Sequence, residues 1–168
     1  MKKFKFTLII AIISITLISC FNRHWSAEQR KEFDTKCSQT DTFNNIVFQF
    51  RGFDNNEFDT IVVKDYKDTV LVDSFKVFVG PAQYPYEKER KERYATIDRT
   101  MNVKHKYHFI IPGQRPYELA NMKMIMWAQY TMTSEGWGCV MGTYTIDGLR
   151  FEHDANPTFI KRDSNNTK

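Results

Sequence analysis

The chain is poor in cysteine and lacks the short signatures that mark common catalytic and redox sites. Only three of its 168 residues are cysteines, and no Cys-x-x-Cys pair occurs. Neither Cys37 nor Cys139 has a histidine within a few residues, which argues against a metal or redox site built on either thiol. Gly-x-Ser-x-Gly, Ser-x-x-Lys and phosphate-binding glycine loops are absent as well. We therefore expect no catalytic residue, no metal and no cofactor.

A clear excess of one charge is also missing once the first 19 residues are set aside. The chain has 24 lysines and arginines against 20 acidic residues, and Lys2, Lys3 and Lys5 precede residue 20, which leaves 21 basic residues. Nucleic acids and anionic lipid surfaces attract proteins that carry a clustered positive excess. The sequence therefore predicts no nucleic-acid partner.

The N-terminus has the pattern of an export signal with a lipidation site. Three lysines precede a largely apolar run from Phe6 to Ile18, which is too short to span a bilayer comfortably and fits a secretory signal peptide. The run ends in Leu17-Ile18-Ser19-Cys20, which resembles the lipobox of bacterial lipoproteins. That resemblance implies cleavage before Cys20, a diacylglycerol on its sulfur and an acylated amine. The alternatives are an uncleaved anchor and an ordinary signal peptide in which Cys20 is incidental.

Lipidation at Cys20 would anchor the mature chain stably. Each buried methylene contributes about 0.8 kcal/mol, and stable anchoring needs more than one acyl chain. Phe21 stands where well-studied lipoproteins retained at the inner membrane carry an aspartate, and no acidic surface-export signal follows in residues 21–25. The resemblance therefore implies a lipid anchor in the outer membrane, and the missing acidic signal favours its periplasmic face over the alternative, the cell surface.

The remaining residues suit one domain of about 149 residues, large enough to bury a core without metal or several disulfides. Residues 20–42 read as a lipidated tether with a short helix, because Ser26-Ala27-Glu28-Gln29 matches a capping box. We expect a β-sandwich domain over residues 43–161 and a disordered tail over residues 162–168.

Alternating and β-branched residues carry the fold prediction. Ile46, Phe48 and Phe50 alternate with less apolar residues, and strand patterns recur in residues 59–63, 69–79, 107–111 and 139–146. Turn residues separate them, among them Asp54-Asn55-Asn56, Gly80-Pro81, Gly136-Trp137-Gly138 and Asp147-Gly148. The sequence therefore predicts a single antiparallel β-sandwich of about seven strands, immunoglobulin- or transthyretin-like.

Two segments are less clear. Residues 117–128 contain good helix formers, but the aromatic and threonine content up to Met132 favours a strand. Residues 84–93 combine Tyr-Pro-Tyr with charges that largely cancel, and we expect a solvated loop or sheet edge there.

Some phrases of the body resemble small, uncharacterised lipoproteins of Bacteroidetes-type bacteria. They are Phe50-Arg51-Gly52-Phe53 ahead of residues 58–63, and the segment from Gly142 to Gly148. The resemblance implies a β-sandwich lipoprotein without a known catalytic role, and it supplies no site residues.

Cys37 and Cys139 are a candidate disulfide pair in an oxidising compartment. Such a bond would close a loop of about a hundred residues and stabilise the fold by about 4 to 5 kcal/mol on the chain-entropy estimate. The alternative is two unpaired cysteines that pack as small hydrophobic residues.

Histidines and clustered acids give weak metal hypotheses. His105 and His108 fall on opposite faces of a strand, while His24 and His153 lie far from them in sequence. The segment from Asp54 to Asp59 is oxygen-rich but lacks the glycine and the final glutamate of a calcium loop. We expect solvated side chains and a polar hairpin turn instead.

Three glutamates and two tryptophans complete the candidates. Glu118, Glu135 and Glu152 could form the paired carboxylates of a glycoside hydrolase. Trp137, expected in a turn, and Trp127, expected in the core, are candidate binding residues because flat aromatic rings stack on sugars and anchor protein contacts.

The predicted function is a membrane-anchored envelope lipoprotein that acts as a binding or structural component. Its partners are the membrane through the N-terminal lipid, and an envelope protein or a glycan. The alternatives are a glycan-binding lipoprotein and a secreted hydrolase with paired carboxylates, but we expect no enzyme.

Overall fold

The computed structural model describes residues 25–130, 135–152 and 156–162, without the side chains of residues 129, 130 and 135. The expected signal peptide, Cys20, His24, His153 and residues 163–168 of the expected tail lie outside the described residues. Within the described part of the chain, neither helix is long and apolar enough to cross a membrane.

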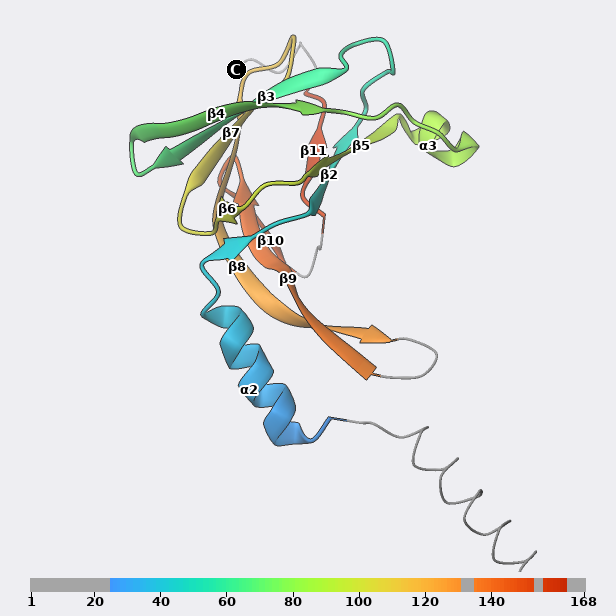
Figure 1. Ribbon diagram of the computed structural model, residues 1–168. Coiled ribbons are helices and arrows are strands. Elements are labelled where there is room, and N and C mark those ends of the chain that lie inside the picture. The colour runs from blue at the N-terminus through green and yellow to red at the C-terminus, as the bar shows by residue number, and fades with distance from the viewer. Residues whose placement is uncertain (1–24, 131–134, 153–155, 163–168) are drawn as a thin grey trace, which may run out of the picture.

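Two sheets face each other at one end of the molecule (Figure 1). The larger has the strand order β10-β9-β8-β7-β3-β4 and is antiparallel throughout, while the smaller has the order β11-β2-β5. The strands are β1 (Thr42–Phe43), β2 (Ile46–Arg51), β3 (Thr60–Lys67), β4 (Val70–Phe78), β5 (Glu92–Ile97), β6 (Met101–Asn102), β7 (Lys106–Ile110), β8 (Tyr117–Tyr130), β9 (Glu135–Ile146), β10 (Leu149–Glu152) and β11 (Thr158–Ile160).

The expected β-sandwich with a short N-terminal helix is confirmed, and it differs from the sequence prediction in two details. Eleven strands occur in the described residues instead of about seven, partly because β1 and β6 form a separate two-residue pair. One pairing is parallel, since β11 lies alongside β2 in the same direction.

Aromatic side chains join the two sheets. Phe48 of β2 and Phe159 of β11 belong to the small sheet, Phe109 of β7 belongs to the large one, and all three are 0% exposed. The ring of Phe109 lies 5.0 Å from that of Phe48 and 4.4 Å from that of Phe159. Fully burying one such side chain stabilises the fold by about 1.5–3 kcal/mol.

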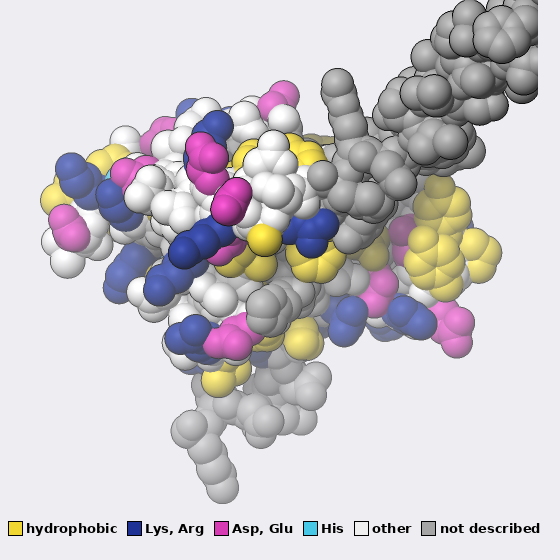
Figure 2. Space-filling model, turned by 90° about the horizontal axis from the view of Figure 1, so that it is seen from below, with side chains coloured by type: hydrophobic (Ala, Val, Ile, Leu, Met, Phe, Trp, Pro, Cys, Tyr) yellow, Lys and Arg dark blue, Asp and Glu magenta, His cyan; other side chains and the backbone are white. Residues whose placement is uncertain are grey.

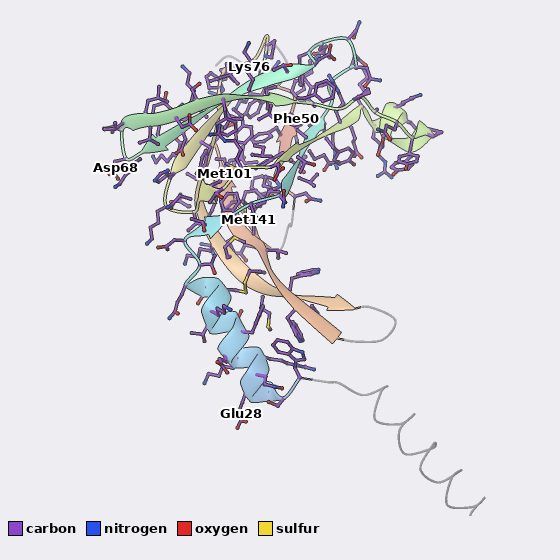
Figure 3. The ribbon with its side chains drawn as sticks, viewed as in Figure 1. Glu28, Phe50, Asp68, Lys76, Met101 and Met141 are labelled. Atoms are coloured by element: carbon purple, nitrogen blue, oxygen red, sulfur yellow. A yellow bond between two sulfur atoms is a disulfide. The ribbon has the colours of Figure 1, made fainter. Side chains whose placement is uncertain are left out.

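We call this two-sheet body, with helix α3 (Pro85–Arg90) and the β1–β6 pair that packs on its core, the head. The stalk is formed by helix α2 (Ala27–Ser38) and the outer parts of β8 and β9, residues 124–130 and 135–140. Figure 1 shows α2 beside this extended ribbon, pointing away from the head. In Figure 3, Phe50 and Met101 lie in the head, whereas Glu28 lies at the far end of the stalk.

Helix α2 begins as its sequence predicts. The Ser26 hydroxyl accepts a hydrogen bond from the Gln29 backbone N–H at 3.2 Å, and the Gln29 side chain accepts one from the Ser26 N–H at 2.8 Å. This capping box satisfies two N–H groups that the helix itself cannot pair. The helix then runs for 12 residues, longer than the one or two turns expected of the tether.

Residues 84–93 correct part of one prediction. Most of them are exposed, and the last two begin β5, the edge strand of the small sheet, in agreement with the alternative of a sheet edge. The expected loop is wrong, because α3 forms here, and Glu87, Glu92 and Arg93 are buried. Arg93 occupies an inward position of β5 next to Ala95, so its charge hides the strand period that an apolar residue would have revealed. Arg162, at the start of the expected tail, is also held in place, because its guanidinium donates to the Arg115 carbonyl at 2.7 Å.

Candidate binding groove in the head

A groove of about 440 Å³ runs between β4 and β5. β4 is the last strand of the large sheet, and β5 is the last strand of the small one. Consecutive residues of both strands line the groove, residues 75–78 on one wall and residues 94–99 on the other. Each wall is therefore a strand edge, and the two sheets leave a gap between them at this side of the sandwich.

The two walls meet at one end of the groove. The Gly80 N–H donates to the Tyr94 carbonyl at 2.8 Å, which forms a single antiparallel bridge just beyond β4. Within the described residues, no further pair joins β4 to β5, and the strands separate from this point. The bridge therefore fixes the narrow end of the groove.

A fully buried arginine reinforces the narrow end. The Arg93 guanidinium, 0% exposed, donates to the carbonyls of Val79 at 2.9 Å and Gly80 at 3.2 Å. It also lies 3.6 Å from the Asp59 carboxylate and 4.7 Å from the centre of the Phe58 ring. Burial lowers the pKa of Arg93, and the nearby carboxylates oppose that shift. An arginine whose donors are all placed in this way holds the end of β4 against β5.

A second ion pair closes the wide end. Arg99, at the end of the β5 wall, donates to Asp73 of β4 at 2.8 Å, and its guanidinium lies 4.3 Å from the centre of the Phe75 ring. Both charged side chains are partly exposed, so this contact is weaker and more easily opened than the buried one.

The groove has an apolar floor and open backbone groups on its walls. Val77, Ala95 and Ile97 are at most 7% exposed and form the floor. The Val79 N–H donates to Asp59 on the β3 side while the Gly80 N–H donates to Tyr94, which sets the alternation along β4. By this alternation, Lys76 and Phe78 aim their backbone N–H and C=O groups into the groove.

The same reasoning applies to β5. The Tyr94 carbonyl points toward Gly80, so Thr96, two residues further, also points its backbone groups away from β2 and into the groove. On β4, the N–H of Ser74 is accepted by the Asp73 side chain at 2.7 Å, which ends the row of open groups. About five residues separate the two closed ends, a span of about 17 Å. This arrangement matches the backbone of one added strand.

Beside the groove, the outer face of the small sheet carries a row of polar contacts. Glu92 accepts from Arg51 at 3.0 Å and from the Tyr94 hydroxyl at 3.3 Å, and Gln49 donates to that hydroxyl at 3.3 Å. Burial raises the pKa of Tyr94, and the charge of Glu92 raises it further. These contacts join β5 to β2 on the side of β5 away from the groove.

The two candidate tryptophans lie in the stalk, where Trp137 is not in the predicted turn and Trp127 is not in the predicted core. Trp137 belongs to strand β9 instead of a turn, and it packs 6.2 Å from Trp25 with the Arg30 guanidinium 5.3 Å from its ring centre. Trp127, expected in the core, is 48% exposed. Gly136 and Gly138, which flank Trp137, lie within strand β9 and form no turn.

The candidate carboxylates do not converge. Glu118 lies beside His108, with the Nε2 nitrogen 3.4 Å from the carboxylate, whereas Glu152 pairs with Arg150 at 2.7 Å. Glu118 lies opposite Asp147, just after β9, whereas Glu152 lies opposite Thr143 of β9. These two partners are four residues apart, which corresponds to about 13 Å along the strand, and Glu118 and Glu152 are in addition two strands apart. That exceeds the about 5–10 Å of a glycosidase pair. The side chain of Glu135 lies outside the described residues.

The histidines and the oxygen-rich turn are held by ordinary polar contacts. His105 Nδ1 lies 2.8 Å from Asp65. Asp54 and Glu57 of the turn pair with Lys91 at 2.9 Å and Lys161 at 2.8 Å. Across the described residues, no three histidine, cysteine, aspartate or glutamate side chains gather as a metal site.

Cys37 and Cys139 form a disulfide with an S–S distance of 1.98 Å. The bond joins the last turn of α2 to β9, so it lies in the stalk close to the head. The chain separation of 102 residues places β1 to β8 between the two cysteines, whereas the rest of β9, β10 and β11 follow Cys139.

Sequence reasoning identified the cysteine pair but missed the groove. Its walls are strand edges, and an edge strand carries the same alternation as a strand inside a sheet. The remaining local signal was the alternation of Ala95 and Ile97 after a charged segment, and the charge of Arg93 kept that alternation too short to predict a strand. Comparison adds no further guide, because the chain matches no protein-family model, no curated protein sequence and no solved structure.

Proposed function

We propose that the protein is a lipid-anchored component of the cell envelope whose head binds an extended segment of a partner polypeptide in the groove between β4 and β5. One observation carries the proposal: both walls of the groove are strand edges with open backbone groups above an apolar floor. A polypeptide strand supplies N–H and C=O groups on both of its sides, and strand addition to an open edge is a common way to recognise peptides.

The proposed ligand has a defined pattern. β4 and β5 run antiparallel at their bridge, so an inserted strand pairs parallel with one wall and antiparallel with the other. Alternate side chains of the ligand point at the floor of Val77, Ala95 and Ile97, and these should be apolar. The others face solvent beside Lys76 and Thr96 and can be polar.

The groove supports a polypeptide better than a glycan. A sugar site needs an exposed aromatic platform, and Trp137 is instead packed against Trp25 and Arg30, while the exposed Trp127 lies in the stalk and does not line the groove. The floor of the groove is aliphatic where its side chains are most buried, which suits alternate apolar residues of a strand.

The anchoring part of the proposal rests on Leu17-Ile18-Ser19-Cys20 and on the position of the stalk. Lipid on Cys20 would be attached five residues before Trp25, at the end of the stalk furthest from the head. The stalk would then hold the groove away from the bilayer, where a periplasmic partner can reach it.

Peptide selection tests the binding function. The full-length protein is immobilised and panned against a phage-displayed library of random octapeptides, and the enriched peptides are synthesised for calorimetry. We expect alternating apolar sequences, and we expect hydrogen exchange of the Lys76, Phe78 and Thr96 amides to slow in their presence. Failure to enrich any such peptide, or binding that leaves all three amides unprotected, would contradict the proposal.

Proline substitutions supply matched controls. Thr96→Pro removes one N–H that faces the groove, and proline is tolerated at an open strand edge, whereas Thr96→Val keeps the N–H. We expect Thr96→Pro to weaken peptide binding about tenfold or more, because a hydrogen bond is lost and the ring obstructs the edge. Thr96→Val should bind normally, and equal binding by both variants would place the ligand elsewhere.

Lipidation is tested separately. Intact mass and membrane flotation are compared for the native protein and for Cys20→Ala. The proposal predicts acyl chains and flotation in the native protein only, and native protein without acyl chains would overturn the anchoring.

A further inference from the structure

The outer face of the stalk carries apolar side chains, one of which is exposed. Trp127 and Ile125 share the face of β8 that points away from α2, and their partners across the ribbon are Gly138 and Val140. Because Gly138 has no side chain, nothing on the neighbouring strand covers the Trp127 ring, which is 48% exposed. The opposite face, which carries Cys139 and Trp137, packs on α2 instead.

This face lies at the end of the molecule where the N-terminal segment enters. Trp25 packs 6.2 Å from Trp137, and Trp137 is paired with Ala128, the neighbour of Trp127. Figure 1 shows the start of α2 and the far part of the β8–β9 ribbon on the same side, away from the head. Five residues separate Cys20 from Trp25, and an extended chain of that length reaches at most about 18 Å.

A lipid attached to Cys20 would therefore keep the bilayer surface close to Trp127. Such a short connection gives a millimolar effective concentration, so a contact that is weak on its own is still well populated. Tryptophan favours the boundary between headgroups and acyl chains, because its ring is apolar and its N–H is polar.

Other occupants fit this face less well. Three partly exposed side chains offer far less than the about 800 Å² that each partner buries in a stable protein interface. Basic and acidic side chains are interspersed on the face seen from below in Figure 2, so attraction to anionic headgroups is not the main contribution. An apolar and aromatic contact with the bilayer remains.

We infer that Trp127 contacts the interfacial region of the bilayer to which Cys20 anchors the chain, with Ile125 and Val140 beside it. This inference rests on the lipidation proposed above. The contact gives the stalk a second point of attachment besides the lipid, and it limits the directions in which the head and its groove can face.

Fluorescence quenching by lipid tests the contact. Lipidated full-length protein is reconstituted in vesicles of phosphatidylethanolamine and phosphatidylglycerol, with or without phospholipids brominated on their acyl chains. The variant Trp25→Phe/Trp137→Phe leaves Trp127 as the one tryptophan of the mature chain, and Trp25→Phe/Trp127→Phe leaves Trp137. We expect brominated lipid to quench most of the emission of Trp127 and much less of that of Trp137.

Two further measurements separate the ways in which the test can fail. If intact mass shows no acyl chains and the protein does not float with vesicles, the lipidation is wrong and the contact falls with it. If the protein is acylated and floats but Trp127 is quenched no more than Trp137, the lipidation stands and the contact is overturned. Trp127→Ala, at an exposed position, guards against misfolding of the double variants, and it should lose most of the quenching seen in the native protein.

Discussion

Two phenylalanines show how the head and the stalk differ. In the head, Phe159 is 0% exposed, and its ring touches four others, those of Phe48, Phe50, Phe109 and Tyr117. In the stalk, Phe33 is half-buried and touches the ring of Trp25 alone among the described aromatic pairs. The head has two sheets to enclose its aromatic core. The stalk has a two-stranded ribbon and one helix, which bury too little apolar surface to be stable alone.

The stalk compensates with bonds of another kind. Besides the disulfide, a capping box starts α2, and the Asp34 carboxylate accepts a hydrogen bond from the Met126 N–H at 3.4 Å. The head is therefore stabilised mainly by packing of buried side chains, and the stalk by a covalent bond in a region that buries little apolar surface. Four changes test this difference.

Removing the disulfide should have the largest effect. The double substitution Cys37→Ser/Cys139→Ser frees a loop with a separation of 102 residues, and the chain-entropy estimate for such a loop is about 4.7 kcal/mol of unfolding free energy. Because the loop contains β1 to β8, which include most strands of the head, unfolding of the head itself should shift in denaturant titrations followed by far-UV circular dichroism. A loss confined to α2, with the head unchanged, would show that the bond acts only as a local clamp.

Phe159→Ala should follow closely. Truncating a buried phenylalanine that contacts four rings costs about 3–5 kcal/mol of unfolding free energy. The matched change in the stalk, Phe33→Ala, should cost about 1 kcal/mol or less, because that ring is already partly hydrated. Denaturant titrations of both variants measure the contrast, and equal losses would refute the assignment of separate forces to the two regions.

Ser26→Ala should affect the stalk alone. Loss of an N-cap side chain costs about 1 kcal/mol of helix stability. Hydrogen exchange should become faster across α2 and remain unchanged in β2, β5 and β7. Ser26→Asp, which preserves an acceptor at the cap, should restore the native exchange rates.

The smallest effect is a pH dependence in the head. Burial alone would raise the pKa of Glu57, but the hydrogen bond from Lys161 and that from the Asp54 N–H outweigh it and lower the pKa from 4.5. A lowered folded-state pKa stabilises the fold above the unfolded value and loses that contribution as the pH falls below it. Stability should therefore decrease from about pH 4.5 downward, and Glu57→Gln should make the decrease shallower in acid titrations of unfolding free energy. An unchanged slope in this variant would assign the acid sensitivity to other groups.

Local patterns predicted the elements whose causes are local. The Ser26 to Gln29 spacing predicted the start of α2, and the alternation of Ile46, Phe48 and Phe50 predicted a half-buried strand. Gly80-Pro81 marked the end of β4 correctly. Each of these signals depends on residues within a few positions of one another, so the sequence alone is enough to predict where these elements begin or end.

The errors arose where the cause lies across the sheet. Trp127 is exposed because its partner across the ribbon is Gly138, and no local pattern reveals that register. Arg93 is buried because carbonyls from residues 79 and 80 converge on it, and a charged residue otherwise indicates a surface.

The bond between Cys37 and Cys139 turns the chain into a closed ring, and the proposed anchor lies outside it. A protease that cuts the backbone once between these cysteines opens the ring without separating the pieces, because both fragments stay joined through sulfur. Only a cut between Cys20 and Cys37 releases the head from a lipid on Cys20. A nicked molecule would remain attached to that lipid, and release of the head would require reduction of the bond or cleavage within that one short segment.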